Sequence, residues 1–356
     1  MSEYCRVQQE LEGLKAEIRA LGTLPERFDA LALKIFQVQF THCRPYRNWC
    51  EAIGWGEVDV ARAVSAGDPR AVPHLPVQAF KYADVLTPTG SGKGDLVFET
   101  SGTTSTRKGT PPGRHTVLDP ALYRWSLLEG FQRVYGPPSG WCILALLPDY
   151  LERKNASLVH MVSALHDESK HPKQGFFLSD TADLLSRARE VLGRGERVMM
   201  LGVTHALLAL AEQKPALPVA EKGQFVVVET GGMKGRRKEL LRPAVHALLR
   251  DGLPDARVDS EYGMTEMLSQ GWACGGGMFE PPKWLRAWVR RPDDPFTAQR
   301  TGRTGGLNFI DLANLHSCSF LSTQDLGRVD GQGCFEVLGR FKDSEVRGCN
   351  LLTLES

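Results

Sequence analysis

A cluster of hydroxyl-bearing residues follows a short apolar segment at 97–98 and leads into the cations Arg107 and Lys108. Hydroxyl groups and backbone N–H groups donate hydrogen bonds that phosphate oxygens accept, and Gly102 lets a ligand approach the backbone closely. The same composition also occurs in ordinary solvent-exposed loops. Phosphate binding is therefore one of two interpretations of this loop, whose principal residues are Ser101, Gly102, Thr103 and Thr104.

Two further glycine-containing segments follow apolar runs, at 229–235 (ETGGMKG) and 262–266 (YGMTE). Ligands of open parallel sheets bind at the carboxyl ends of the strands, so these segments and the hydroxyl loop are expected to converge on one crevice. Tyr262 is either a core residue or a stacking surface for a purine. Glu266 offers a carboxylate that suits Mg²⁺ between phosphates. Together the three loops predict an ATP site.

Short apolar runs alternate with amphipathic helical patterns from residue 96 onward. Strands are expected at 96–99, 142–148, 175–178, 197–202 and 224–229, with helices between them. One helix is expected over 119–136, with Asp119 as its cap and Gly136 as its stop, and another is capped by Ser179 or Asp180. The alternation predicts βαβ units in a largely parallel sheet covered on both faces, and hence an α/β fold.

The flanking regions have different patterns. Apolar residues at helical spacing predict two helices within 7–42, whereas 45–88 contains several prolines and is expected to be irregular. After about residue 282, short strand-like runs separated by glycines predict a meander or small barrel. We therefore expect four regions: helical residues 1–75, an α/β nucleotide-binding core at 76–280, a β-rich subdomain at 281–338, and a hinge with a short arm at 339–356.

Composition narrows the possible functions. The formal net charge of +1 gives no broad positive field for nucleic acid. No run approaches the roughly 18 apolar residues of a membrane span, and the polar start is not a secretory signal. The eight cysteines include no closely spaced CxxC pair, which argues against a zinc knuckle. We expect reduced thiols in a cytoplasmic protein.

The segments TSGTTS, GGMKG, YGMTE, STQDLG and GRFKD occur in the order of the signature loops of adenylate-forming enzymes, which include acyl-CoA synthetases, luciferase and peptide-synthetase adenylation domains. The chain resembles this superfamily from about residue 76 to its end. Residues 146–162 and 339–352 look most like the acyl-protein synthetase of bacterial luminescence, which activates fatty acids. The resemblance implies a large α/β domain with mostly parallel sheets and a small β-rich subdomain. Because the chain ends at Ser356, shortly after Asp343, the C-terminal lid domain of the superfamily is expected to be largely absent.

The resemblance also implies a role for individual residues. Ser101, Gly102, Thr103 and Thr104 would hold the phosphates. Thr265 would contact the α-phosphate and Glu266 the metal. Asp325 and Arg340 would contact the ribose. Lys234 or Lys342 would substitute for the missing lid lysine. Adenine would lie among Gly231, Gly232, Met233, Tyr262 and Gly263.

Cys349 is the candidate nucleophile for a second step. It follows Arg347 and Gly348, and a thiolate near a cation is a good nucleophile toward a mixed anhydride. A buried, inert thiol is the alternative, and Cys318 and Cys334 are expected in the core. His160 is either a packed histidine or a contact of the substrate carboxylate, and His115 a cap or phosphate contact. His205, Trp272 and Met278 are candidates for lining the acyl pocket, and plain packing is the alternative for Trp272 and Met278.

We therefore predict that ATP and Mg²⁺ activate a carboxylic acid, with a fatty acid as the default, to acyl-AMP. Transfer to a thiol, expected to be that of Cys349, would precede hand-over to an acyl reductase or a carrier protein. One alternative is a ligase that passes the acyl group to CoA, a carrier protein or an amine. The other is a nucleotide-binding protein without catalysis.

Overall fold

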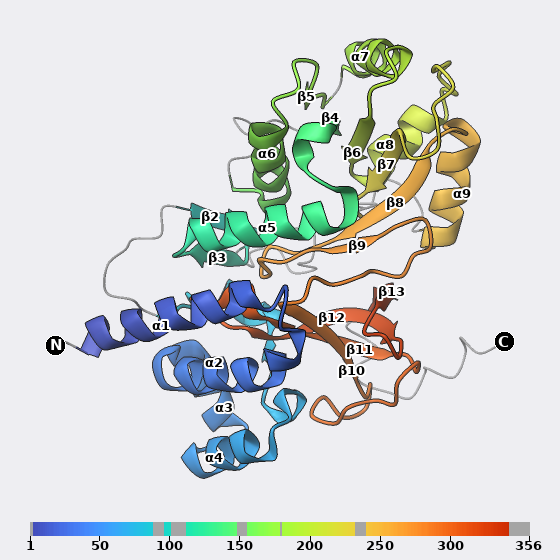
Figure 1. Cartoon of the computed structure of the whole chain (residues 1–356). Coiled ribbons are helices and arrows are strands. Elements are labelled where there is room, and N and C mark those ends of the chain that lie inside the picture. Colours follow the sequence, from blue (N-terminus) through green and yellow to red (C-terminus); the bar gives the residue numbers. More distant parts are fainter. Residues whose placement is uncertain are drawn as a thin grey trace. The chain divides into compact units, whose positions relative to one another are not determined.

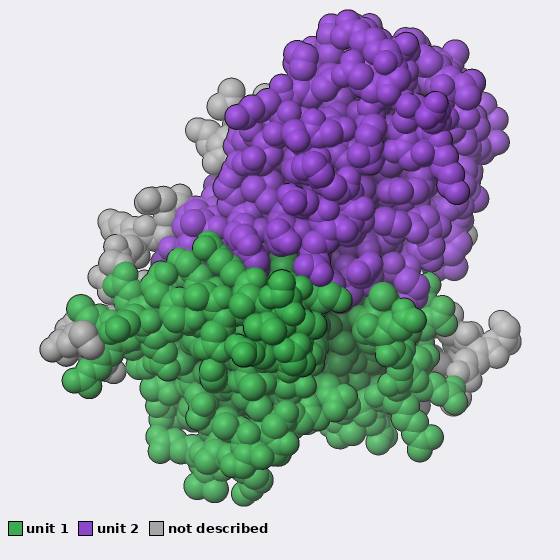
Figure 2. All heavy atoms as spheres, in the orientation of Figure 1, with its two compact units in different colours: residues 1–92, 283–356 green, residues 93–282 purple. Residues whose placement is uncertain are grey.

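The computed structural model describes residues 3–87, 96–100, 112–147, 155–178, 180–231 and 240–341. The chain forms two compact units, coloured separately in Figure 2: unit 1 contains residues 1–92 and 283–356, and unit 2 contains residues 93–282. We predicted residues 1–75 and 281–338 as separate regions. In the structure both lie almost entirely in unit 1. No described helix is long and apolar enough to cross a membrane.

The described part of unit 1 begins with the four α-helices that Figure 1 labels α1 to α4. Both helices predicted within 7–42 are confirmed, but the prediction that 45–88 is irregular is wrong, because it contains two more helices. These helices are short and each buries only two residues, so they produce no apolar stripe in the sequence. The α-helices are α1 (Glu3–Ala20), α2 (Phe28–His42), α3 (Arg44–Ala52) and α4 (Glu57–Ala66), with 3-10 turns η1 (Pro25–Arg27), η2 (Pro69–Ala71) and η3 (Val77–Lys81).

The sheet of unit 1 confirms the predicted meander. Its strands are β10 (Leu285–Arg290), β11 (Gly305–Asp311), β12 (Phe320–Val329) and β13 (Phe335–Arg340), and each pairs antiparallel with the next. The 3-10 turn η5 (Leu312–Asn314) follows β11, and strand β1 (Leu75–Pro76) pairs parallel with β12. Phe320 of β12 packs against Phe36 and Tyr46, at ring distances of 5.7 and 6.2 Å. The N-terminal helices and the C-terminal meander therefore share one core.

Unit 2 contains a six-stranded sheet in the order β5-β4-β6-β7-β8-β9, parallel except for β9. The predicted βαβ alternation is confirmed. Asp119 accepts a hydrogen bond from the N–H of Leu122 at the start of α5, and Asp180 accepts one from Asp183 at the start of α7. The strands are β4 (Cys142–Leu146), β5 (Gly175–Phe176), β6 (Val198–Gly202), β7 (Phe225–Glu229), β8 (Arg257–Tyr262) and β9 (Gly271–Ala273); the helices are α5 (Pro120–Tyr135), η4 (Pro138–Gly140), α6 (Ser157–Ser169), α7 (Thr181–Gly193), α8 (Thr204–Ala211) and α9 (Arg242–Gly252).

Helices cover both faces of this sheet (Figure 1). Met200, Val227 and Val258 point to one face, where they form an apolar core with α7, α8 and α9. Phe131 of α5 packs against Trp272 of β9 on the opposite face, with ring centroids 5.8 Å apart. The strands are buried on both sides, which explains why residues 142–146, 198–202 and 225–228 are all apolar.

A separate antiparallel hairpin precedes the sheet. The predicted strand at 96–99 exists as β2 (Leu96–Glu99), but it pairs with β3 (Arg114–Val117) and not with the parallel sheet. The prediction that the hydroxyl loop follows a strand of the parallel sheet is therefore wrong. Both strands are four residues long, too short for their pattern to identify a partner.

Candidate functional site

The strands β6, β7 and β8 end next to one another. Their register pairs Gly202 with Glu229 and Glu229 with Ser260. Beyond the strands, the backbone N–H of Thr204 donates to the carbonyl of Gly231 at 3.3 Å. Gly231 has a φ of 70°, which favours glycine because it has no Cβ. Gly231 thus lies at the carboxyl edge of the sheet; Gly232, Met233 and Lys234 lie outside the described residues.

Glu229 is the centre of this edge, although the sequence analysis did not select it. One carboxylate oxygen accepts hydrogen bonds from the Thr204 hydroxyl at 2.8 Å and from the Gly231 N–H at 2.9 Å. The other oxygen accepts from the Ser260 hydroxyl at 2.6 Å and from Arg242 Nε at 3.2 Å. The Glu229 carboxylate therefore links the ends of three strands and holds the start of the GGMKG segment.

The network keeps Glu229 ionised inside the protein. Burial alone would raise the pKa of Glu229, but the ring of His246, whose Nε2 lies 3.8 Å from a carboxylate oxygen, and the charge of Arg242, followed by the Ser260 and Thr204 hydroxyls, lower it to about 2. An acidic residue at the end of an otherwise apolar strand was the signal in the sequence that could have identified it.

The YGMTE segment continues from β8. Tyr262 is 8% exposed and its ring packs against Phe279 at 5.7 Å. The backbone carbonyl of Thr265 lies 2.9 Å from Nδ1 of His115. Since a carbonyl only accepts hydrogen bonds, Nδ1 carries the hydrogen. Burial lowers the pKa of His115 to about 4, so its ring is neutral near pH 7. His115 therefore connects β3 to the segment that holds Thr265 and Glu266.

The ends of the hydroxyl loop are fixed to the same region. The N–H of Thr100 donates to the carbonyl of Gly113 at 2.9 Å, and the N–H of Gly113 donates to the Thr100 hydroxyl at 2.8 Å. The N–H of Glu99 donates to the carbonyl of Asn155, which lies just before α6. The hairpin thus brings the loop's ends to the residues that follow β8, even though β2 is outside the parallel sheet. Ser101, Gly102, Thr103 and Thr104 themselves lie outside the described residues.

His160 of α6 lies in an aromatic cluster. Its ring stacks on Tyr123 at 5.5 Å and meets the edge of Phe98 at 5.5 Å. Burial, and then the charge of Arg124, lower the pKa of His160. His205 lies in α8 beside Thr204, and Met278 is half-buried after β9. Trp272 is buried against α5.

Asp325 and Arg340 belong to unit 1, where they are register partners on β12 and β13. Arg340 Nε donates to an Asp325 carboxylate oxygen at 3.0 Å. Asp325 is buried, whereas the Arg340 side chain is 57% exposed. The pair assigned to the ribose is therefore adjacent. Lys342, Asp343, Arg347, Gly348 and Cys349 lie outside the described residues; Cys318 is buried and Cys334 half-buried.

A half-buried arginine that the sequence analysis missed lies near this pair. Arg290 donates to the carbonyls of Leu307 at 3.0 Å and Thr323 at 2.6 Å, and to Asn308 Oδ1 at 2.7 Å. Burial lowers the pKa of Arg290 to about 10, and the charge of Asp325 opposes this.

The predicted metal ligand is Glu266, which is 7% exposed. Among the described residues, no group of three or more His, Cys, Asp or Glu side chains is arranged to hold a metal ion. Mg²⁺ in nucleotide sites takes one or two carboxylates, and phosphates and water supply its other ligands. A single Glu266 fits a metal that arrives with the nucleotide and does not fit a resident metal.

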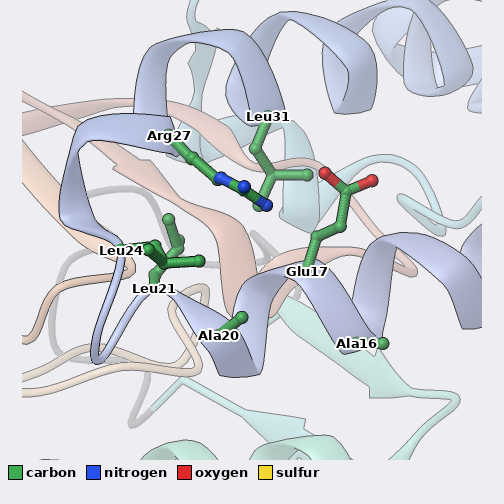
Figure 3. Close-up of a pocket in the computed structure, with 7 residues that line it drawn as sticks. All are labelled: Ala16, Glu17, Ala20, Leu21, Leu24, Arg27 and Leu31. Carbon is green, nitrogen blue, oxygen red and sulfur yellow. The ribbon is translucent and has the colours of Figure 1, made fainter.

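Two hollows in unit 1 contain none of the predicted site residues. One, of about 180 Å³, lies between α1 and α2, and the side chains of Glu17, Arg27 and Leu31 reach into it (Figure 3). The other, of about 700 Å³, is lined by β10 and nearby turns and includes Arg70 and Arg300.

Solved structures share this fold. A luciferase-like enzyme from the nonluminescent mealworm Zophobas morio superposes with a TM-score of 0.50 and 14% identity, over 72% of this chain and 60% of that one. A 2-hydroxyisobutyryl-CoA ligase, solved in an open conformation with 2-HIB-AMP and CoA, superposes with a TM-score of 0.61 and 14% identity, over 88% of this chain and 75% of that one. The chain thus spans less than two thirds of the mealworm enzyme. No protein-family model and no curated protein sequence matches it. The predicted α/β fold is confirmed, and it is the fold of these two enzymes.

Proposed function

On the premise of this shared fold, we propose that the protein activates a carboxylic acid with ATP and then passes the acyl group to a thiol. In the first step, a carboxylate oxygen attacks the α-phosphorus of ATP, giving acyl-AMP and releasing pyrophosphate. In the second step, a thiolate attacks the acyl carbon, a thioester forms, and AMP leaves.

One observation carries this proposal. The segments containing Gly231 and Thr265 lie at the carboxyl edge of one sheet, and the hydrogen bond between His115 and Thr265 fixes the hydroxyl-loop hairpin to the second segment. Backbone N–H groups and hydroxyls at such an edge suit a nucleotide. Catalysis here would be positioning and charge neutralisation.

Within the proposal, each group has one task. Ser101, Gly102, Thr103, Thr104 and Thr265 bind phosphates. Glu266 holds the Mg²⁺ that accompanies ATP, which neutralises phosphate charge when it is bound. Asp325 and Arg340 bind the ribose. Lys234 or Lys342 supplies the positive charge that a lysine of the lid domain supplies in the superfamily. The base lies among Gly231, Gly232, Met233, Tyr262 and Gly263.

The identity of the acid and of the thiol rests on the resemblance to the luminescence acyl-protein synthetase. That resemblance favours a fatty acid, transfer to Cys349, and hand-over to an acyl reductase or carrier protein in the cytoplasm. The rival acceptor is CoA, which would make Cys349 unnecessary.

The test is ATP–pyrophosphate exchange over a panel of carboxylic acids, followed by intact-mass measurement of the protein. We expect acid-dependent exchange and an acyl adduct on the wild-type protein. The adduct should be lost in Cys349→Ser and kept in the control Cys5→Ser. Exchange without an adduct, together with acyl-CoA formation, would favour the external acceptor. ATP binding without exchange for any acid would favour a nucleotide-binding protein without catalysis.

A further inference from the structure

Glu261 of β8 is a buried acid that the proposed mechanism does not use. It is 7% exposed, and no described residue donates a hydrogen bond to its carboxyl group. One carboxyl oxygen lies 2.6 Å from the place that a Cβ on Gly263 would occupy, and Gln270 Cγ lies 3.6 Å from the same place. Residues two apart on a strand face the same side, so the carboxyl group reaches along the strand toward its carboxyl end.

The direction of this side chain distinguishes it from Tyr262. Neighbouring residues of a strand face opposite sides. Tyr262 packs on Phe279, whose ring lies 4.6 Å from the Arg242 guanidinium of α9. Glu261 pairs across the strands with Trp272, which packs on the α5 side. If the base meets Tyr262, then Glu261 faces the side of β8 that the base does not occupy.

The chemistry of the group limits what it can bind. Burial, and then the charge of Glu229, raise the pKa of Glu261 to about 8. At neutral pH the group is therefore mainly a neutral carboxylic acid, which both donates and accepts a hydrogen bond. The buried Nε1 of the neighbouring Trp272 also has no acceptor among the described residues. A buried polar group without a partner lowers the stability of the folded protein, and a ligand that supplies the partner removes this cost.

We propose that Glu261 is a specificity-determining residue that selects an acid with a hydroxyl group on its acyl chain. This inference rests on the proposed function and narrows its substrate class. A hydroxyl group matches the neutral carboxyl group because each can donate and accept. An ammonium group would require the ionised form, which burial disfavours.

The experiment compares matched acids in the exchange reaction: butyrate, hexanoate and decanoate, each with its 2-hydroxy, 3-hydroxy and 2-amino derivative. For the wild type, kcat/KM for one hydroxy acid is expected to exceed that for the unsubstituted acid by about tenfold or more. Glu261→Leu should abolish or reverse this ratio, and Glu261→Gln, which still donates and accepts, should keep part of it. Thermal unfolding checks that both variants are folded.

The outcomes separate the two proposals. Exchange with equal ratios in wild type and Glu261→Leu, or a wild-type preference for unsubstituted or amino acids, overturns the role of Glu261 alone. If no acid supports exchange in the wild type, the proposed function itself fails, and this inference fails with it. A structural role for Glu261 would change the unfolding temperature and leave the ratio between acids unchanged.

Discussion

The ends of β7 and β8 place two buried glutamates on adjacent strands in opposite electrostatic states. Glu229 is 3% exposed and Glu261 is 7% exposed. Glu229 accepts hydrogen bonds from hydroxyls, a backbone N–H and an arginine, and its pKa falls to about 2. Glu261 has no such donor among the described residues, and its pKa rises to about 8. Partners therefore decide the charge of a buried carboxyl group, and similar burial gives contrary results.

The strongest test of this contrast is the same substitution at both positions. Glu229→Gln removes the charge that faces Arg242, and breaking a buried pair costs roughly 3–5 kcal/mol. Glu261→Gln removes no partner and should change the free energy of unfolding at pH 7 slightly or increase it. Urea unfolding followed by circular dichroism measures both. Equal losses of unfolding free energy in the two variants would mean that the hydrogen bonds of Glu229 stabilise the fold no more than the Glu261 carboxyl group does.

The dependence of stability on pH should separate the two acids further. Glu261 has a folded pKa above the unfolded value of 4.5, so its contribution is present below pH 4.5 and is lost as pH rises toward 8, at up to about 1.4 kcal/mol per pH unit. Glu229 has a depressed pKa, so its contribution is present above pH 4.5 and is lost as pH falls toward 2.

The measurement is the difference in unfolding free energy between wild type and each glutamine variant, taken from pH 2 to 9, since other groups then cancel. The Glu261→Gln difference should change above pH 5, whereas that for Glu229→Gln should change only in acid. Parallel curves would contradict the assignment of opposite charge states.

His115 extends the comparison to a buried base, whose Nδ1 donates to the Thr265 carbonyl. His115→Leu should lower the free energy of unfolding by about 1–3 kcal/mol, because the carbonyl loses its donor. The pKa of His115 is lowered from 6.5 to about 4, so its contribution is present above pH 6.5 and is lost as pH falls toward 4. Urea unfolding at pH 7 and 5 should show a smaller acid-induced loss in His115→Leu than in wild type. An identical loss would show that another group titrates.

The smallest effect on stability is expected for the ion pair between Arg340 and Asp325, because the Arg340 side chain is largely exposed. Arg340→Ala removes a half-exposed ion pair with Asp325 and should cost less than about 1 kcal/mol. If Arg340 binds the ribose, KM for ATP in the exchange assay should nevertheless rise by about tenfold. Arg328→Ala is the matched control, since Arg328 forms an ion pair with Glu336 on the same two strands. Equal KM values for the two variants would remove Arg340 from the site.

Local patterns in the sequence were sufficient for much of the fold. The helix between Asp119 and Gly136 was predicted within one residue of α5 because its cap and its stop are properties of single residues. The strand predicted at 224–229 corresponds to β7 and was identified because residues 225–228 are all apolar, as in a strand covered on both faces. The pairing of β2 was not predictable from such patterns, because it depends on residues of β3 beyond the hydroxyl loop.

The candidate site was predictable only in part. The glycines of the GGMKG segment, Tyr262 and Glu266 were identified because residues of these types often contact nucleotides. They also lie in segments that follow strands. Glu229 and Glu261 were missed because their roles depend on contacts between strands. Arg290 was missed for the same reason, since it binds Thr323, which is distant in sequence. Their environments exist only in the folded chain.

The pairing of β1 with β12 affects how the protein is made. Unit 2 is a continuous stretch of chain, so it can fold while the ribosome is still translating the rest. The first helices cannot complete their own core until residues 320–329 have been synthesised, because Leu75 pairs with Leu321, and Phe36 packs on Phe320. The apolar surface of α2 therefore stays exposed in the nascent chain until then, and we expect chaperones to bind it.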